Sequence, residues 1–413
     1  STYLAGDSTY KTITTGTSWQ SVETGSTMTA VAGNGYPINT TSNACTVTLP
    51  AGSVGDTIEF VDYAGTWDTN MVTLTANGSE KIKGSTDNSL LGDEGQGVKI
   101  VYVDATQGWK AVTGVNETIP VIKPPSYNVE WLVVAGGGGG GGGDHGAGGG
   151  AGGYRTGTTL SLDMGTAYTI VVGGGGDGTN TNTVTGDDGV DSSISGTGIT
   201  TITSTGGGGG GAYCAGADGG SGGGGGAHSA GTGQTWAPGS GNTPSITQYT
   251  AAGETTTVQG YDGGDNATYD TDNYPGGGGG GASAVGGDAA SNSVAGDGGA
   301  GVNNAIVETG TDVGYAGGGA GGIGGGGTAG TATHGGGNAG ANASGTNATA
   351  YTGGGGGGGS GASSTPGGNG GSGIVVLRML ASRYSGSVTG SPTGTTDGDY
   401  KVLKFTGDGS YTA

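Results

Sequence analysis

The stretch VEWLVVAGGGGGGGG, residues 129–143, decides between two very different folds. An apolar segment followed by glycine begins a dinucleotide-binding loop, but it also begins a polyglycine segment. The dinucleotide loop requires a following helix whose N-terminus faces the phosphates. The next residues, DHGAGGGAGGYRTG (144–157), cannot form that helix, because each glycine is about 1 kcal/mol less favourable than alanine inside a helix. The sequence therefore argues against a nucleotide-binding loop.

The remaining ordered conformation for oligoglycine is an extended left-handed helix with three residues per turn and a rise of about 3.1 Å. Such a helix has no internal hydrogen bonds, and a buried unpaired backbone group costs about 1–3 kcal/mol. Chains without Cβ atoms can pack side by side and bond laterally, but ordering glycine is entropically costly. Anchoring is therefore needed, and the apolar segments VEWLVVA (129–135) and GIVVLRML (373–380) suit it. The competing interpretation is a disordered low-complexity chain.

Composition supports the polyglycine interpretation over a conventional core. The chain has 413 residues with 110 Gly, and about a third of residues 127–380 are glycine. Good helix formers are scarce, so we expect almost no α-helix. The 32 acidic against 11 basic side chains argue against nucleic acid or an anionic membrane surface as partner. No run of 18 apolar residues exists, so we expect no membrane insertion.

Glycine density and turn residues divide the chain into segments. Short alternating stretches such as DTIEFVDY (56–63) and VKIVYVD (98–104) predict a small antiparallel β module. The fold class is therefore mainly β and polyglycine type II, a β module followed by a bundle of packed polyglycine helices with flanking β strands. The predicted domains are an N-terminal extension (1–43), the β module (44–118), a Pro-rich linker (119–126), the glycine-rich domain (127–380) and a C-terminal strand pair (381–413).

These segments resemble a known family. VEWLVVAGGGGGGGGDHGAGGGAGGYRTG (129–157), followed by AYTIVVGGGG (167–176) and closed by GGSGIVVLRML (370–380), resembles the glycine-rich domain of bacteriophage tail-fibre and receptor-binding proteins, especially those of cyanophages. Residues 46–84 and 98–112 are similar to a β-rich module of the same fibre proteins. The tail DYKVLKFTGDGSYTA (399–413) resembles a strand pair that usually precedes such a domain. It could pair within the chain or with a neighbouring subunit.

The resemblance implies a tail-fibre or fibre-tip protein on the outside of the virion. Loops of the glycine-rich domain would recognise the host, through a surface glycan or an outer-membrane protein. Other virion tail proteins and two further copies of the chain, forming a homotrimer, would be its partners. Two alternatives are a purely structural fibre or decoration protein without receptor binding, and a glycan depolymerase.

The longer insertions in the glycine-rich domain, 233–249 and 259–277, are the candidate receptor-binding loops. They combine aromatic rings with Asp and Asn, a mixture suited to sugars or protein loops. The candidate residues are Trp236, Tyr249, Tyr261, Tyr269 and Tyr274. The alternative is that these rings fill gaps left by glycine and order the loops.

Metal binding and catalysis have weaker support. Four carboxylates offer the oxygen ligands that calcium takes, without the spacing of an EF-hand loop: Asp262, Asp265, Asp270 and Asp272. Their alternative role is a solvated acidic surface. His145, His228 and His334 lie in Gly/Ala contexts with no further ligand nearby, and Cys45 and Cys214 indicate no disulfide framework. A glycosidase needs two carboxylates about 5–9 Å apart, and no pair stands out, so we expect no catalytic residues and no cofactor apart from calcium.

Overall fold

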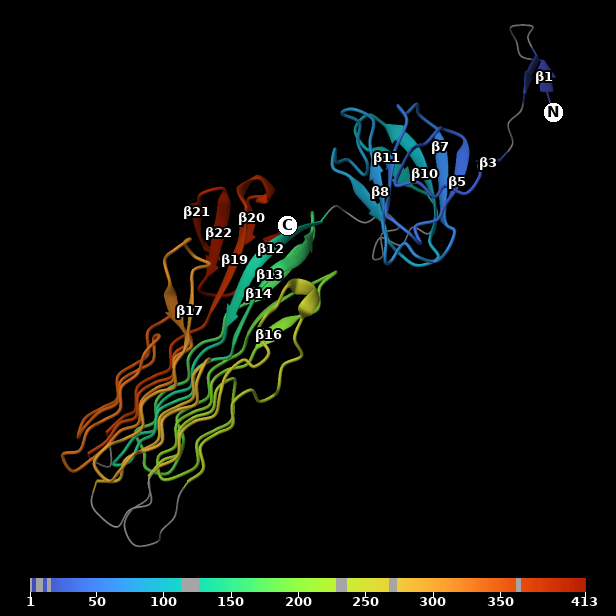
Figure 1. The fold of residues 1–413 in the computed structure, drawn as a ribbon. Coiled ribbons are helices and arrows are strands. Elements are labelled where there is room, and N and C mark those ends of the chain that lie inside the picture. Colours follow the sequence, from blue (N-terminus) through green and yellow to red (C-terminus); the bar gives the residue numbers. More distant parts are fainter. Residues whose placement is uncertain are drawn as a thin grey trace. The chain divides into compact units, whose positions relative to one another are not determined.

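The computed structural model describes residues 2–4, 10–12, 16–112, 126–227, 236–266, 273–361 and 365–413. The chain forms two compact units, Ser1–Ser126 and Tyr127–Ala413 (Figure 1). Both are built from β strands and extended chain. The helices of the described residues are two single 3-10 turns, η1 (Thr250–Ala252) and η2 (Ala381–Arg383), and none of them has the length or apolar character to cross a membrane. The predicted β-rich fold with almost no α-helix is therefore confirmed.

The first unit contains a five-stranded sheet, a four-stranded sheet and a separate hairpin. The five-stranded sheet has the order β11 (Gly108–Ala111), β10 (Gly97–Asp104), β7 (Thr57–Asp62), β5 (Asn34–Ile38) and β3 (Ser18–Trp19). The four-stranded sheet has the order β4 (Thr27–Thr29), β6 (Cys45–Thr48), β8 (Val72–Thr75) and β9 (Ser89–Leu91). The hairpin joins β1 (Thr2–Leu4) and β2 (Tyr10–Thr12). Alternate residues of β7 are buried, as its sequence pattern predicts.

Strand directions in this unit differ from the predicted antiparallel module. The pairs β3–β5, β5–β7, β4–β6 and β6–β8 are parallel, whereas β7–β10, β10–β11 and β8–β9 are antiparallel. The alternating pattern determines which face of a strand is buried, but not the direction of its neighbour. Strands β3, β4 and β5 also lie within residues 1–43, so that segment contributes to both sheets from residue 18 onward.

The second unit carries its strands at one end, here called the strand end. One sheet has the order β13 (Tyr154–Asp163), β12 (Ser126–Val134), β19 (Ile374–Leu380), β22 (Tyr400–Phe405) and β21 (Thr393–Asp397). The other has the order β16 (Ile202–Ser204), β15 (Ser192–Gly196), β14 (Ala167–Val171), β23 (Gly409–Thr412) and β20 (Ser387–Thr389). A hairpin joins β17 (Val302–Asn304) to β18 (Val313–Tyr315). Buried side chains from both large sheets, including Trp131, Tyr168 and Phe405, form one core.

The two apolar segments that flank the glycine-rich region pair with each other. Strands β12 and β19 run antiparallel, with a register from Glu130 opposite Arg378 to Val134 opposite Ile374. The C-terminal segment then joins the same structure, because β22 pairs with β19 and β23 pairs with β14. The sequence left open whether the C-terminal strands pair within the chain or with a neighbouring subunit, and in this structure they pair within the chain.

The glycine runs lie side by side and bond laterally through their backbones (Figure 1). The run 136–143 is buried, and its N–H groups donate to three neighbouring runs in turn. Gly136 and Gly139 donate to Val190 and Asp187, Gly137 and Gly140 to Gly371 and Gly368, and Gly138 and Gly141 to Gly150 and Ala147. The pattern therefore repeats every three residues, as a helix with three residues per turn requires. The lateral bonding expected of packed glycine chains is present.

Cys45 and Cys214 are both free thiols, the first buried and the second half-buried. Their state agrees with the absence of a disulfide framework in the sequence.

Candidate functional site

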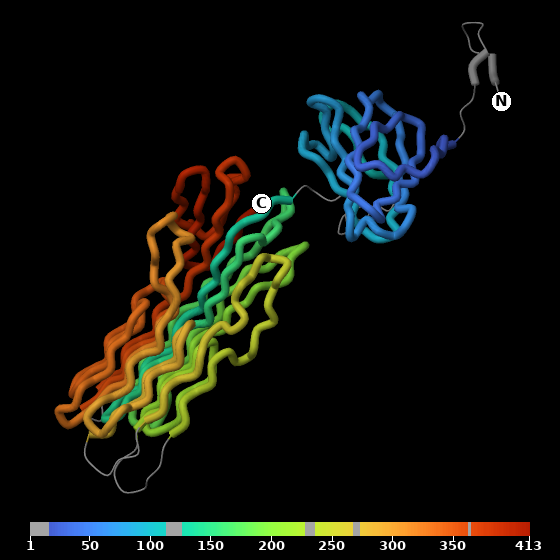
Figure 2. Tube along the Cα trace, in the orientation of Figure 1, coloured from blue at the N-terminus to red at the C-terminus, as the bar shows by residue number. Residues whose placement is uncertain are grey.

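The end of the bundle opposite the strands, here called the far end, is formed by turns between glycine runs (Figure 2). The run 136–143 leaves strand β12 and reaches its turn at residues 143–145. Gly143 has a φ of +76°, a left-handed conformation that glycine adopts without strain. The run 206–211, which follows β16, likewise ends in a bend at residues 212–214. Residues that are distant in sequence therefore meet at this end.

Three rings meet at the far end and form what we call the far-end cluster: His145, Tyr213 and Tyr274. The imidazole centroid of His145 lies 4.5 Å from the ring of Tyr213 and 4.4 Å from that of Tyr274, both edge to face. Such contacts stabilise aromatic pairs beyond simple burial. His145 is 5% exposed, whereas the two tyrosines are half-buried and contribute to the surface.

The phenol of Tyr213 is held in its neutral form. Burial, with smaller contributions from the nearby Asp144 and Tyr274, raises the pKa of Tyr213 to about 12. A neutral phenol both donates and accepts hydrogen bonds. The far-end cluster thus combines ring surface with polar hydroxyls, which suits contact with a polar ligand such as a sugar or a protein loop.

Of the predicted binding residues, Tyr274 and Trp236 lie at the far end. Trp236 is half-buried, and its backbone N–H donates to Oδ1 of the buried Asn266 at 3.0 Å. Tyr269, another of the predicted binding residues, lies outside the described residues. His145 and Tyr213 were absent from the predicted set. The signal that could have identified them is their position directly after a glycine run, where the chain must turn.

The other two predicted binding residues lie elsewhere. Tyr249 packs against the core of the strand end, and its N–H donates to Oε2 of Glu254 at 2.6 Å. Tyr261 is 39% exposed and lies along a run, two residues beyond Gln259, whose carbonyl accepts from Tyr154 at the start of β13. The structure therefore does not bring Tyr249 and Tyr261 together with Trp236 and Tyr274.

Of the two calcium candidates that the structure describes, Asp262 uses its carboxylate for a backbone contact, whereas the contact of Asp265 is made by its backbone N–H. Oδ1 of Asp262 accepts from the N–H of Gly241 at 2.7 Å, and the N–H of Asp265 donates to Oδ1 of Asp288 at 2.8 Å. Burial and the charge of Asp288 raise the pKa of Asp265. Asp270 and Asp272 lie outside the described residues. Within the described part, no three His, Cys, Asp or Glu residues are grouped in a way that could hold a metal ion.

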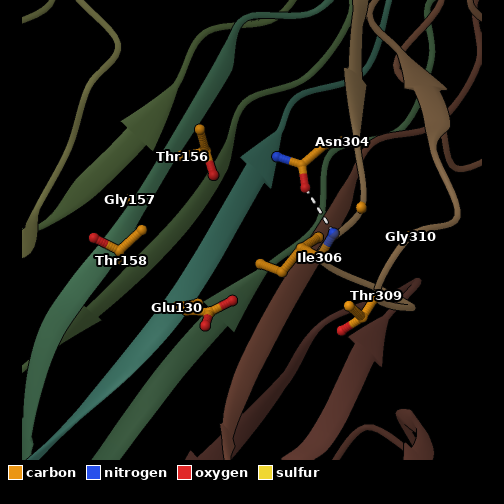
Figure 3. Close-up of a pocket in the computed structure, with 9 residues that line it drawn as sticks. Glu130, Thr156, Gly157, Thr158, Asn304, Ile306, Thr309 and Gly310 are labelled. Atoms are coloured by element: carbon orange, nitrogen blue, oxygen red, sulfur yellow. Dashed lines mark hydrogen bonds between the residues drawn. The ribbon is translucent and has the colours of Figure 1, made fainter. Parts of the chain in front are cut away.

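A shallow hollow of about 350 Å³ lies beside β12, β13 and the β17–β18 hairpin (Figure 3). It is lined by Glu130, Thr156, Gly157, Thr158, Asn304, Ala305, Ile306, Thr309 and Gly310. Glu130 is the one carboxylate among them, and both of its oxygens accept from Nη1 of Arg378, at 3.1 and 3.2 Å. The amide of Asn304 donates to the hydroxyl of Tyr154 at 2.7 Å. A paired carboxylate of this kind does not provide the two acids of a glycosidase.

Comparisons with known proteins match both units of the chain. Residues 3–118 match the family model of the bacteriophage T4 gp9/10-like protein N-terminal domain. A relative is the baseplate wedge protein gp10 of Enterobacteria phage T4, which is 45% identical over 64 residues, covering 15% of this chain and 11% of the relative. The matched part thus spans about a tenth of the length of that relative. These matches support a bacteriophage tail or baseplate-type protein located in the virion.

The larger match covers the glycine runs and the two apolar strands that pair at their ends. Residues 113–380 match the family model of the glycine-rich domain. This range includes the far-end cluster and the hollow beside β12. The chain therefore belongs to the glycine-rich domain family.

Proposed function

We propose that this protein is a tail-fibre or fibre-tip protein that attaches the virion to the host cell surface. The observation that carries the proposal is the construction of the second unit. Laterally bonded glycine runs join the strand end to a far end made of turns, where Tyr213, Tyr274 and Trp236 gather. Rings next to amide and carboxylate groups suit the recognition of a surface glycan or an outer-membrane protein.

The first unit would join the protein to other virion tail proteins. Its match to the gp9/10-like N-terminal domain supports this part of the proposal. We further propose a homotrimer, as in similar fibres, and a binding mode without catalysis or a cofactor. Averaged electron micrographs of the purified full chain test the trimer, because a threefold particle supports it and a monomeric or twofold particle contradicts it.

Adsorption of the purified full chain to host cells tests receptor binding. The variants Trp236→Ala and Tyr274→Ala are expected to weaken binding at least tenfold while still unfolding in one cooperative transition. Tyr351→Ala is the matched control, because Tyr351 is 47% exposed and lies beside Gly353, near Val134 at the strand end. If all three variants bind host cells as tightly as the wild-type chain, the far end is excluded as the contact surface.

The second candidate is a structural tail or baseplate component that makes no contact with the host. The similarity to a baseplate wedge protein favours this alternative. The same assay separates the two functions, because a structural component binds no host cells in any variant. Release of oligosaccharide from the cells would instead indicate a glycan depolymerase.

A further inference from the structure

Exposed Asp and Asn side chains form a recurring contact along the outer glycine runs. The carboxylates of Asp188 and Asp191 accept from the N–H groups of Gly209 and Gly206, each at 2.8 Å. The same contact joins Asp218 to Ser240 at 2.6 Å, Asp262 to Gly241 at 2.7 Å, and Asp297 to Thr331 at 2.7 Å. In each case a side-chain oxygen of one run accepts a backbone N–H of the adjacent run.

Interior runs satisfy their N–H groups in a different way. Within 136–143, the N–H groups of residues 136 to 141 each donate to a backbone carbonyl of a neighbouring run. An outer run has no further run on its outward side, so some of its N–H groups need another acceptor. Asp188 and Asp191 are three residues apart and therefore lie on the same face of a chain with three residues per turn. Their spacing places both oxygens where the carbonyls of a further run would lie.

Asparagine makes the same contact without a charge. Oδ1 of Asn369 accepts from Gly178 at 2.9 Å, Oδ1 of Asn347 from Asn369 at 2.8 Å, and Oδ1 of Asn338 from Ala332 at 2.8 Å. The shared property is an acceptor oxygen on a short side chain. Lys and Arg offer only donors and cannot perform this role. No Lys or Arg occurs between Arg155 and Arg378.

We propose that these Asp and Asn side chains terminate the hydrogen-bonded array of glycine runs. Each occupies the acceptor position that a glycine run from a second copy of this chain would otherwise fill. The array thereby keeps a finite width, just as charged side chains and bulges protect the edge strands of β-sheets. The inference is independent of receptor binding.

Two variant sets at the same four positions of the full chain test this proposal. Asp188, Asp218, Asp262 and Asp297 are replaced together by Asn, which keeps the acceptor oxygen, or together by Ala, which removes it. Sedimentation velocity over a range of concentrations should give the wild-type size for the Asn set and larger, concentration-dependent species for the Ala set. An Ala set of wild-type size would overturn the proposal. Equal association of both sets would also overturn it, because charge repulsion and not capping would then keep the copies apart.

A single-site measurement keeps the test decisive if the four-fold Ala variant does not fold. Asp262→Ala and Asp262→Asn are compared by hydrogen exchange at the amide of Gly241. Exchange should accelerate about tenfold in the Ala variant, the ratio that corresponds to one ordinary hydrogen bond, and stay near the wild-type rate in the Asn variant. Unchanged exchange in Asp262→Ala would show that the carboxylate does not cap this N–H.

Discussion

Arg155 and Glu254 form a two-pronged ion pair inside the strand end, with Nε–Oε1 at 2.7 Å and Nη2–Oε2 at 2.8 Å. The residues are 5% and 4% exposed. The guanidinium also donates to the carbonyls of Thr203 and Thr247, at 3.0 and 3.1 Å. One buried cation therefore joins β13, β16 and the insertion before η1.

Breaking this ion pair should destabilise the second unit. Glu254→Leu leaves the Arg155 cation buried without its counter-ion, at an expected cost of about 3–5 kcal/mol. The double variant Arg155→Met with Glu254→Leu should lose less, because no unpaired charge remains. Differential scanning calorimetry of both variants measures the difference. A double variant that is less stable than Glu254→Leu would contradict the explanation.

Glycine should be indispensable in the interior of the bundle and replaceable where space is open. A Cβ on Gly138 would overlap the carbonyl of Gly208, whereas a Cβ on Gly174 meets no atom within 4 Å. Gly138→Ala is expected to destabilise the unit by about 1–3 kcal/mol or more, because the runs must move apart. Gly174→Ala should leave the unfolding midpoint nearly unchanged. Urea unfolding compares the two, and equal stability would argue against close packing of the runs.

Acid should loosen the contact between Asp397 and the β17–β18 hairpin. The hydroxyl and N–H of Thr309, at 2.6 and 3.0 Å, and the Arg378 guanidinium hold the pKa of Asp397 below its ordinary value. A lowered folded pKa means that the stabilisation is present above the unfolded pKa and is lost as pH falls through the folded one. The loss should therefore begin below about pH 4.

NMR titration of the Asp397 carboxyl carbon checks this expectation. Thr309→Val removes the hydroxyl but keeps the backbone N–H, so it should move the pKa of Asp397 part of the way back to its ordinary value. An ordinary pKa in the wild-type protein would show that these contacts do not form in solution.

The two thiols should differ sharply in reactivity. Burial, together with a smaller effect of the charge of Glu23, raises the pKa of Cys45 to about 11. At pH 8 its reactive thiolate is therefore almost absent. Alkylation of the native protein followed by mass spectrometry should label the half-buried Cys214 and not Cys45, and Cys214→Ser should leave the protein almost unlabelled. Rapid labelling of Cys45 would contradict its burial.

The sequence by itself determined the type of each segment. Alternating Val, Ile and Thr in stretches such as 56–63 specify strands, because one face must be buried. Glycine runs such as 136–143 exclude helices and, having no Cβ atoms, allow lateral bonding. Apolar residues in 129–135 and 373–380 identified the segments that anchor the glycine runs, and the structure pairs these two segments at the strand end.

The tertiary structure alone decided which segments are neighbours. A glycine run carries no side chain that could encode its partner, so the pairing of Gly137 with Gly371 cannot be read from either run. For the same reason the sequence could not show that Tyr249 and Tyr274, which lie in adjacent insertions, are at opposite ends of the bundle. The sequence also could not identify His145 as a member of the far-end cluster, because its ring contacts form only when three turns that are distant in sequence meet. Side-chain patterns specify burial, whereas contacts between backbones depend on how the whole chain is threaded.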